Sequence, residues 1–103
     1  MATLTIVRVK CNTKEDYIGK DDIYLRVNGK RYKVGRFSNN TSEEVGKSWA
    51  FDDEIEVQIW EQDEDPDDKI GEHTFHASEA GGGVKKQNYS GHGASYDLWY
   101  KIE

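Results

Sequence analysis

The strongest constraint on this chain is a strict alternation of apolar and polar residues in several short segments. In DDIYLRV, the apolar residues Ile23, Leu25 and Val27 fall on one face of an extended chain, and EIEVQIW and YDLWYKIE repeat the pattern. Successive side chains of a strand point to opposite faces of a sheet, so segments of this kind form half-buried strands. The sequence therefore predicts an all-β protein.

The segments between these strands refine the prediction. Residues 4–11 alternate with one slip of phase, which predicts a strand with a β-bulge. The dipeptide 28–29, Asn-Gly, predicts a tight hairpin. Residues 39–47 have helix-capping residues but one apolar side chain, so we expect at most one helical turn there. The Gly-rich segment 79–95 is expected to be a long surface loop. About seven to eight short strands joined by turns indicate an antiparallel β-sandwich.

Length, charge and cysteine content limit the classes of function. The 103 residues are expected to form a single domain, 1–103, and the formal net charge of −6 argues against binding to nucleic acid or to bare anionic lipid. One cysteine excludes an internal disulfide and a cysteine metal cluster. We expect no transmembrane segment and no signal peptide, because no apolar run is long enough. A cytoplasmic location follows, with peripheral attachment to a membrane as an option.

The negative charge is concentrated in two predicted connections between strands. The second, EQDEDPDDKIG, packs six carboxylates into eight residues. Like charges a few ångströms apart cost roughly 1 kcal/mol per pair even in water, so this connection is either a solvated loop or a cation site. If both connections lie at one end of the sandwich, that end carries these acids: Asp16, Asp21, Asp22, Glu61, Asp63, Asp65, Asp67 and Asp68.

Clustered carboxylates point to a hard cation. Ca²⁺ takes six to eight oxygen ligands, commonly carboxylates and carbonyls on loops, whereas Mg²⁺ needs fewer protein ligands and stricter geometry. Zinc would need His or Cys ligands. His73 and His76 are three residues apart on a predicted strand and so fall on opposite faces. Calcium is therefore the expected ion.

Two segments give the chain a resemblance to the C2 domain, a β-sandwich that holds calcium between loops at one end and in many members docks on phospholipid. In DYIGKDDIYLRV, Asp16, Gly19 and Asp22 have the spacing of the first calcium loop of that family, and IWEQDEDPDDKIGE has the acids of its third loop. Ile23 stands where the family usually has Pro, and Glu61 where it has Asp, which leaves the register of the third loop open by one or two residues. The chain also resembles short bacterial C2-like modules.

The resemblance implies a calcium-binding module that docks on anionic phospholipid or another anionic partner. By analogy, one or two ions would be bridged by Asp16, Asp22, Glu61, Asp63 and Asp68, with Asp21, Asp65 and Asp67 as substitutes. Candidate contacts with a membrane or a partner are Tyr17, Ile18, Lys30, Arg31 and Lys33. Alternating lysines on a strand also protect a sheet edge against unwanted pairing.

The sequence also contains residues that bear on two other classes of function. Trp60 and Trp99 fall on the outward phase of their strands, and Trp49 precedes a turn. Exposed together, they would make a carbohydrate- or protein-binding surface, with the acidic loops merely structural or solvated; alternatively, they cover a second core layer. We expect no enzyme, because the acids lie in a charged loop instead of a cleft and no Ser-His-Asp arrangement is recognisable. His92 is expected to be an ordinary loop residue.

Overall fold

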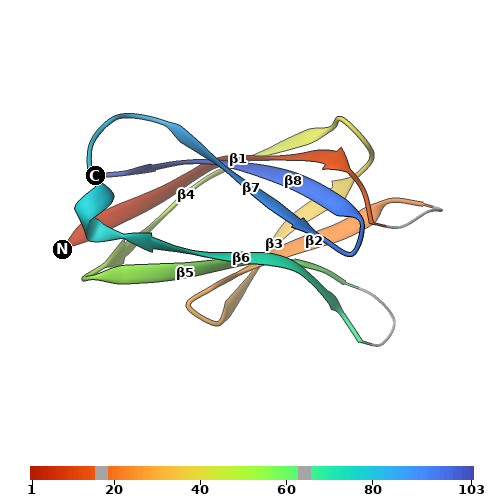
Figure 1. Ribbon diagram of the computed structural model, residues 1–103, viewed down its shortest axis with the longest axis horizontal. Coiled ribbons are helices and arrows are strands. Elements are labelled where there is room, and N and C mark those ends of the chain that lie inside the picture. The colour runs from red at the N-terminus through yellow and green to blue at the C-terminus, as the bar shows by residue number, and fades with distance from the viewer. Residues whose placement is uncertain (16–18, 63–65) are drawn as a thin grey trace.

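Strand formation dominates this chain because apolar side chains recur at every second position. The computed structural model describes residues 1–15, 19–62 and 66–103. These residues form eight strands and one short 3₁₀ turn, η1 (Figure 1). The elements are β1 (Ala2–Thr13), β2 (Asp21–Val27), β3 (Lys30–Phe37), β4 (Ser42–Phe51), β5 (Glu54–Glu61), β6 (Asp68–His76), η1 (Ala77–Glu79), β7 (Lys85–Gly91) and β8 (Ala94–Ile102).

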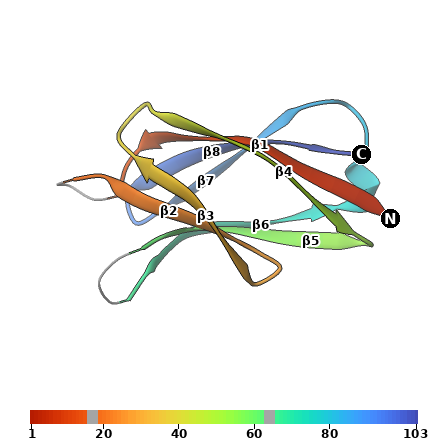
Figure 2. The same cartoon turned by 180° about the vertical axis from the view of Figure 1, so that it is seen from behind.

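The strands make two antiparallel sheets that face each other. One sheet has the order β4-β1-β8-β7 and the other β3-β2-β5-β6. Consecutive strands run in opposite directions along the long axis, so the connections that follow β1, β3, β5 and β7 gather at one end (Figures 1 and 2). We call this end the loop pole; both chain termini lie at the other end. The fold thus brings four connections that are far apart in sequence to one end of the sandwich.

The core lies between the sheets and follows the predicted alternation. Ile23, Leu25 and Val27 of β2 are buried, as are the alternate apolar residues of β5 and β8. The predicted bulge in β1 is present, as a shift of register between Ile6 and Arg8. The predicted Asn-Gly hairpin joins β2 to β3, and both turn residues have positive φ.

The structure differs from the expectations for two of the remaining segments. The segment expected to hold at most one helical turn belongs largely to β4, and the expected long surface loop contains β7. Both strands lie at the edges of their sheet, so each pairs with one neighbour and exposes most of its side chains. β7 buries only Tyr89, and an apolar alternation is therefore missing from its sequence.

None of the described residues belongs to a helix long and apolar enough to cross a membrane.

Candidate metal centre

The two acidic connections both reach the loop pole. The first joins β1 to β2 and the second joins β5 to β6, and the amide of Gln62 donates to the carbonyl of Asp22 over 2.7 Å, which links their roots. The second connection therefore begins beside the end of the first. Five of the residues predicted from sequence lie outside the described ranges: Asp16, Tyr17, Ile18, Asp63 and Asp65.

Three carboxylates continue the inward face of their strands toward the loop pole. Asp21 precedes the buried Ile23 by two residues, and Glu61 follows the buried Ile59 by two. Asp68 is directly opposite Glu61 in the β5–β6 pairing, so both side chains lie on the same face of the sheet. Asp21 and Glu61 are 0% and 1% exposed, and Asp68 is half-buried. The core thus ends in a layer of acids.

Asp21 connects the two sheets and the first acidic connection. Its Oδ2 accepts hydrogen bonds from the Tyr96 hydroxyl over 2.5 Å and from the amide of Glu15 over 2.7 Å. Burial, followed by the bond to Asp21, raises the pKa of Tyr96 far above its ordinary value, so the hydroxyl stays protonated and donates. The backbone of Glu15 is thereby held against a buried group.

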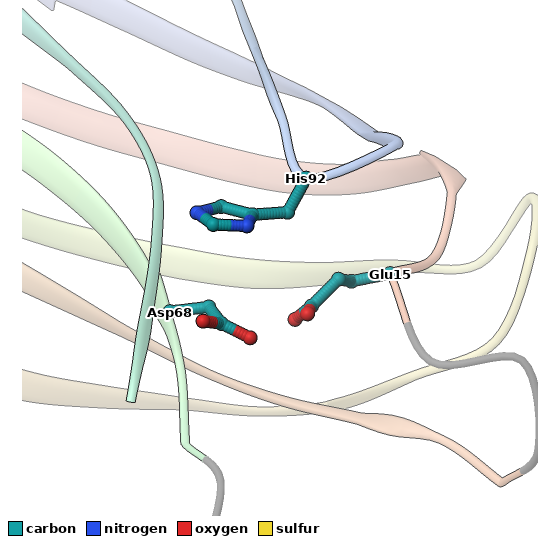
Figure 3. A group of neighbouring side chains, drawn as sticks. All are labelled: Glu15, Asp68 and His92. Carbon is teal, nitrogen blue, oxygen red and sulfur yellow. The ribbon is translucent and has the colours of Figure 1, made fainter. Parts of the chain in front are cut away.

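A cluster of possible ligands forms at the mouth of this acidic layer. Glu15, Asp68 and His92 each offer one ligand atom, and these atoms all lie within 4.8 Å of one another. Figure 3 shows the three side chains converging from the β1–β2 connection, the first residue of β6 and the β7–β8 turn. Glu15 and Asp68 are half-buried and His92 is exposed. The cluster combines two carboxylates with one imidazole.

A close approach of backbone to backbone places His92 in this cluster. A Cβ atom on Gly91 would lie 2.2 Å from the carbonyl oxygen of Ile70, so only glycine lets the end of β7 come this near to the start of β6. His92 and Gly93, with φ of 51° and 79°, form the two-residue turn between β7 and β8. The imidazole therefore stands beside Asp68.

Sequence reasoning missed Glu15 and His92 as candidate ligands. Glu15 lies one residue before the family-like motif that begins at Asp16. His92 was expected to be an ordinary loop residue, although the glycines on both sides of it are a signal of a tight turn that packs closely.

Two further acids at the loop pole are engaged on the outer face of the sheet. Asp22 alternates with the buried Asp21, and its Oδ1 lies 3.3 Å from Nε of Arg36. The Tyr24 hydroxyl donates to Oδ2 of Asp67 over 2.6 Å. Each of these contacts uses one carboxylate oxygen of Asp22 or Asp67.

The basic residues predicted as partner contacts lie on β3, which is an edge strand. Lys30 and Lys33 are exposed there. The Arg31 guanidinium lies 3.9 Å from the ring centroid of Tyr24 and donates to the Gln62 side chain over 2.7 Å. Arg31 thus covers the outer face and reaches toward the second acidic connection, while the two lysines suit the protection of an edge.

The tryptophans belong to outer layers in which cations cover the rings. Trp60 stacks on Tyr24 with a centroid separation of 6.2 Å, and Arg26 lies 5.0 Å from the Trp60 ring. Trp99 is covered by Arg8 at 4.2 Å. Both tryptophans are half-buried. These contacts favour the second packing layer over an open surface for stacking on sugars.

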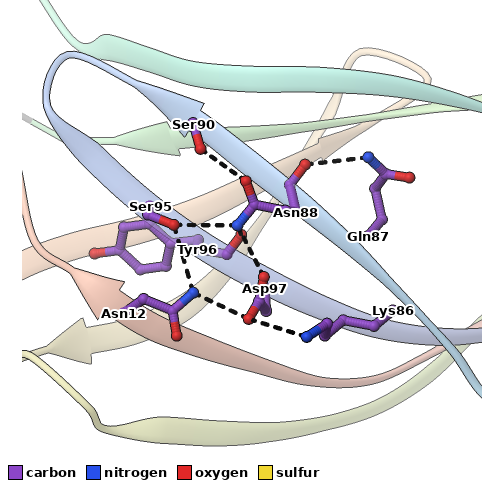
Figure 4. A network of polar contacts seen from close by, with 8 residues as sticks. All are labelled: Asn12, Lys86, Gln87, Asn88, Ser90, Ser95, Tyr96 and Asp97. Atoms are coloured by element: carbon purple, nitrogen blue, oxygen red, sulfur yellow. Dashed lines mark hydrogen bonds and ion pairs between the residues drawn. The ribbon is translucent and has the colours of Figure 1, made fainter.

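One more carboxylate is buried away from the loop connections, on the outer side of the other sheet. Asp97, 8% exposed, accepts hydrogen bonds from Asn12 over 3.0 Å and from Asn88 over 2.9 Å, and Lys86 lies 3.9 Å away (Figure 4). Burial alone would raise the pKa of Asp97. The hydrogen bonds from Asn88 and Asn12 and the charge of nearby lysines stabilise the carboxylate more strongly, so the pKa of Asp97 is lowered. This network joins β1, β7 and β8.

Comparison with solved structures places this architecture among C2 domains. A structure described as a C2 domain matches over 100% of this chain and 99% of its own, with a TM-score of 0.64 at 10% identity. The C2A domain of plant Extended Synaptotagmin 1 matches over 99% of this chain and 92% of its own, with a TM-score of 0.60 at 10% identity. The fold of this chain is therefore a C2-like antiparallel β-sandwich.

A much larger protein also contains this fold. Human GIVD cytosolic phospholipase A2, solved with an inhibitor and terbium chloride, matches with a TM-score of 0.59 at 17% identity. The match covers 99% of this chain and 17% of the phospholipase chain. No protein-family model and no curated protein sequence matches this chain.

Proposed function

We propose that this protein is a calcium-binding C2-like module, not an enzyme, that docks on an anionic partner through calcium held at the loop pole. The observation that carries the proposal is the meeting of the two acidic connections there, with ligand atoms of Glu15 and Asp68 within 4.8 Å of each other. The likeness to C2 domains supports it, because those modules hold calcium between loops at one end.

The proposed ligands come from both connections. Among the described residues, Asp68 and Glu61 face the inner side of the pole, and Glu15 lies beside Asp68. The sequence adds Asp16, Asp63 and Asp65, and the family pattern adds Asp22. Carboxylate oxygens on loops are the ligands that Ca²⁺ prefers. The buried layer below, with Asp21 held by Tyr96, gives the ligands a fixed base.

The mechanism of docking is electrostatic. Without a cation, the pole repels anions, because its described and predicted ligands are carboxylates. One or two bound calcium ions reverse the local sign, and coordination positions that the protein does not fill accept phosphate or carboxylate oxygens of a partner. Anionic phospholipid is the first candidate, with Tyr17 and Ile18 as residues that would contact the bilayer.

Calorimetric and thermal titration with calcium tests the metal step. The parent chain should release or absorb heat on binding, and its melting temperature should rise, since an ion that binds only the folded state stabilises it by about 2.7 kcal/mol at one hundred times its dissociation constant. The double variant Asp63→Asn/Asp68→Asn should bind at least about tenfold more weakly, which corresponds to roughly 1.4 kcal/mol. Asp52→Asn, an exposed acid at the opposite end, is the matched control.

Vesicle sedimentation tests the docking step. Vesicles that contain phosphatidylserine should bind the chain in calcium and release it in chelator, whereas pure phosphatidylcholine vesicles should not. The absence of both heat and a thermal shift with calcium would overturn the proposal. Calcium-independent binding to a sugar or a protein would support the alternative, a binding sandwich whose acidic loops are only solvated.

A further inference from the structure

We propose that Glu15, Asp68 and His92 form a second kind of metal site, one that takes a transition-metal ion of the zinc type through a mixed set of two carboxylates and one imidazole. The inference goes beyond the proposed function because its defining ligand is a nitrogen atom from the β7–β8 turn. Of the acids that the sequence predicts as calcium ligands, the proposed zinc site uses only Asp68.

The geometry is near that of a zinc site. In a tetrahedral site, two atoms that are each about 2.1 Å from the zinc ion lie about 3.4 Å apart, so ligand atoms as far apart as 4.8 Å need to close by up to about 1.4 Å. We expect rotation of the exposed His92 side chain and of the half-buried Glu15 and Asp68 side chains to supply this movement. Figure 3 shows the imidazole and both carboxylates directed into the same space.

The chemistry of the donor set selects the ion. Imidazole suits zinc, copper, iron and nickel, whereas Ca²⁺ and Mg²⁺ take oxygen ligands. Two carboxylates balance the double positive charge of the ion, and a neutral imidazole adds a ligand without adding charge. Three protein ligands leave a position for water or for an anionic oxygen, as in zinc sites that remain open.

Each of the three ligands is positioned by a separate feature of the described fold. The amide of Glu15 is tied to buried Asp21, and Asp68 occupies a fixed register opposite Glu61. His92 is brought in by the contact between Gly91 and the carbonyl of Ile70, for which any larger residue leaves no room. Ligands that are held before the ion arrives lose little freedom on binding, which favours affinity.

Zinc titration of the parent chain, compared with two variants, tests the inference. His92→Asn removes the imidazole and keeps the turn, because Asn tolerates the positive φ of this position. Glu15→Gln removes one carboxylate charge. Both should bind zinc about tenfold or more weakly than the parent. His76→Gln is the control, because His76 is an exposed histidine on β6 outside the cluster.

Nitrogen-detected NMR of the imidazole rings gives a direct readout. Zinc should shift the ring signals of His92 and leave those of the other two histidines unchanged. The inference is overturned if the parent does not bind zinc, if His92→Asn binds it like the parent, or if His76→Gln loses as much affinity as His92→Asn.

A parallel calcium titration separates this inference from the proposed function. The His92→Asn variant should keep the calcium affinity of the parent, while its zinc affinity should fall. A parent that binds calcium and not zinc would overturn the inference alone. A parent that binds zinc and not calcium would support the inference and overturn the proposed calcium module.

Discussion

The Tyr96 hydroxyl donates a hydrogen bond to Oδ2 of Asp21 over 2.5 Å and so joins the two sheets directly beneath the loop pole. Tyr96 belongs to β8 in one sheet and Asp21 to β2 in the other, and both are 0% exposed. The same carboxylate accepts from the amide of Glu15. One buried acid therefore couples the packing of the sandwich to the position of the first acidic connection.

Replacing Tyr96 by Phe should destabilise the fold by about 1–3 kcal/mol, because a buried carboxylate loses a donor. Tyr89→Phe is the matched control: its hydroxyl donates to the neutral carbonyl of Val57 over 3.1 Å, and its loss should cost about 0.5–1.5 kcal/mol. Urea unfolding of both variants measures the difference. Equal losses, or no loss for Tyr96→Phe, would contradict the assigned role of Asp21.

Alkaline pH should weaken the fold through the buried tyrosines. Burial raises the pKa of both Tyr89 and Tyr96 above the ordinary 10.0. Above pH 10 the unfolded chain loses these protons and the folded chain keeps them, so the free energy of unfolding falls by about 1.4 kcal/mol per pH unit for each tyrosine. Unfolding measured from pH 9 to 11.5 should show this slope, and Tyr89→Phe should show a shallower one.

Asp97→Asn should destabilise the chain at neutral pH by about 1–3 kcal/mol, since the new amide cannot accept the two asparagine bonds as a carboxylate does. The lowered pKa of Asp97 adds stability above its ordinary pKa of 3.8, and this contribution is lost as pH falls through the lower folded value. The difference between parent and variant should therefore shrink in acid. Urea unfolding at pH 7 and pH 3 checks this, with exposed Asp53→Asn as the control.

Gly91→Ala should be one of the most damaging small substitutions in the chain. The added methyl would lie 2.2 Å from the carbonyl oxygen of Ile70, and overpacking of this kind costs about 1–3 kcal/mol or more. Gly71→Ala is the graded control, because its methyl would meet the Tyr89 side chain at the longer distance of 3.2 Å. In thermal melts, the Gly91→Ala variant should have a lower melting temperature than the Gly71→Ala variant. The reverse order would show that β6 and β7 separate easily.

The sequence predicted the central strands well because burial on one side leaves a period of two. Ile23, Leu25 and Val27 carry that signal plainly, as does the Asn-Gly turn beside them. The edge strands β4 and β7 carry no such signal, since β7 buries only Tyr89. Their pairing depends on partners distant in sequence, which local patterns do not encode.

The candidate site was predicted only in part for a similar reason. The clustered acids can be recognised in the amino-acid sequence, and the alternating direction of consecutive strands brings their connections to one end of the sandwich. The contribution of His92 depends on the contact of Gly91 with Ile70, which joins residues of different sheets. Which of two adjacent acids faces inward also depends on register: Asp21 is buried, while Asp22 contacts Arg36.

The pairing of the two chain ends has a practical consequence for experiments. Thr3 and Glu103 exchange two backbone hydrogen bonds, of 2.8 and 3.0 Å, at the end of the sandwich opposite the loop pole. A tag, bead or sensor chip attached at either end would hold the molecule in nearly the same orientation, with the two acidic connections directed toward the solution. Immobilisation through the first or the last residue should therefore give interchangeable binding measurements.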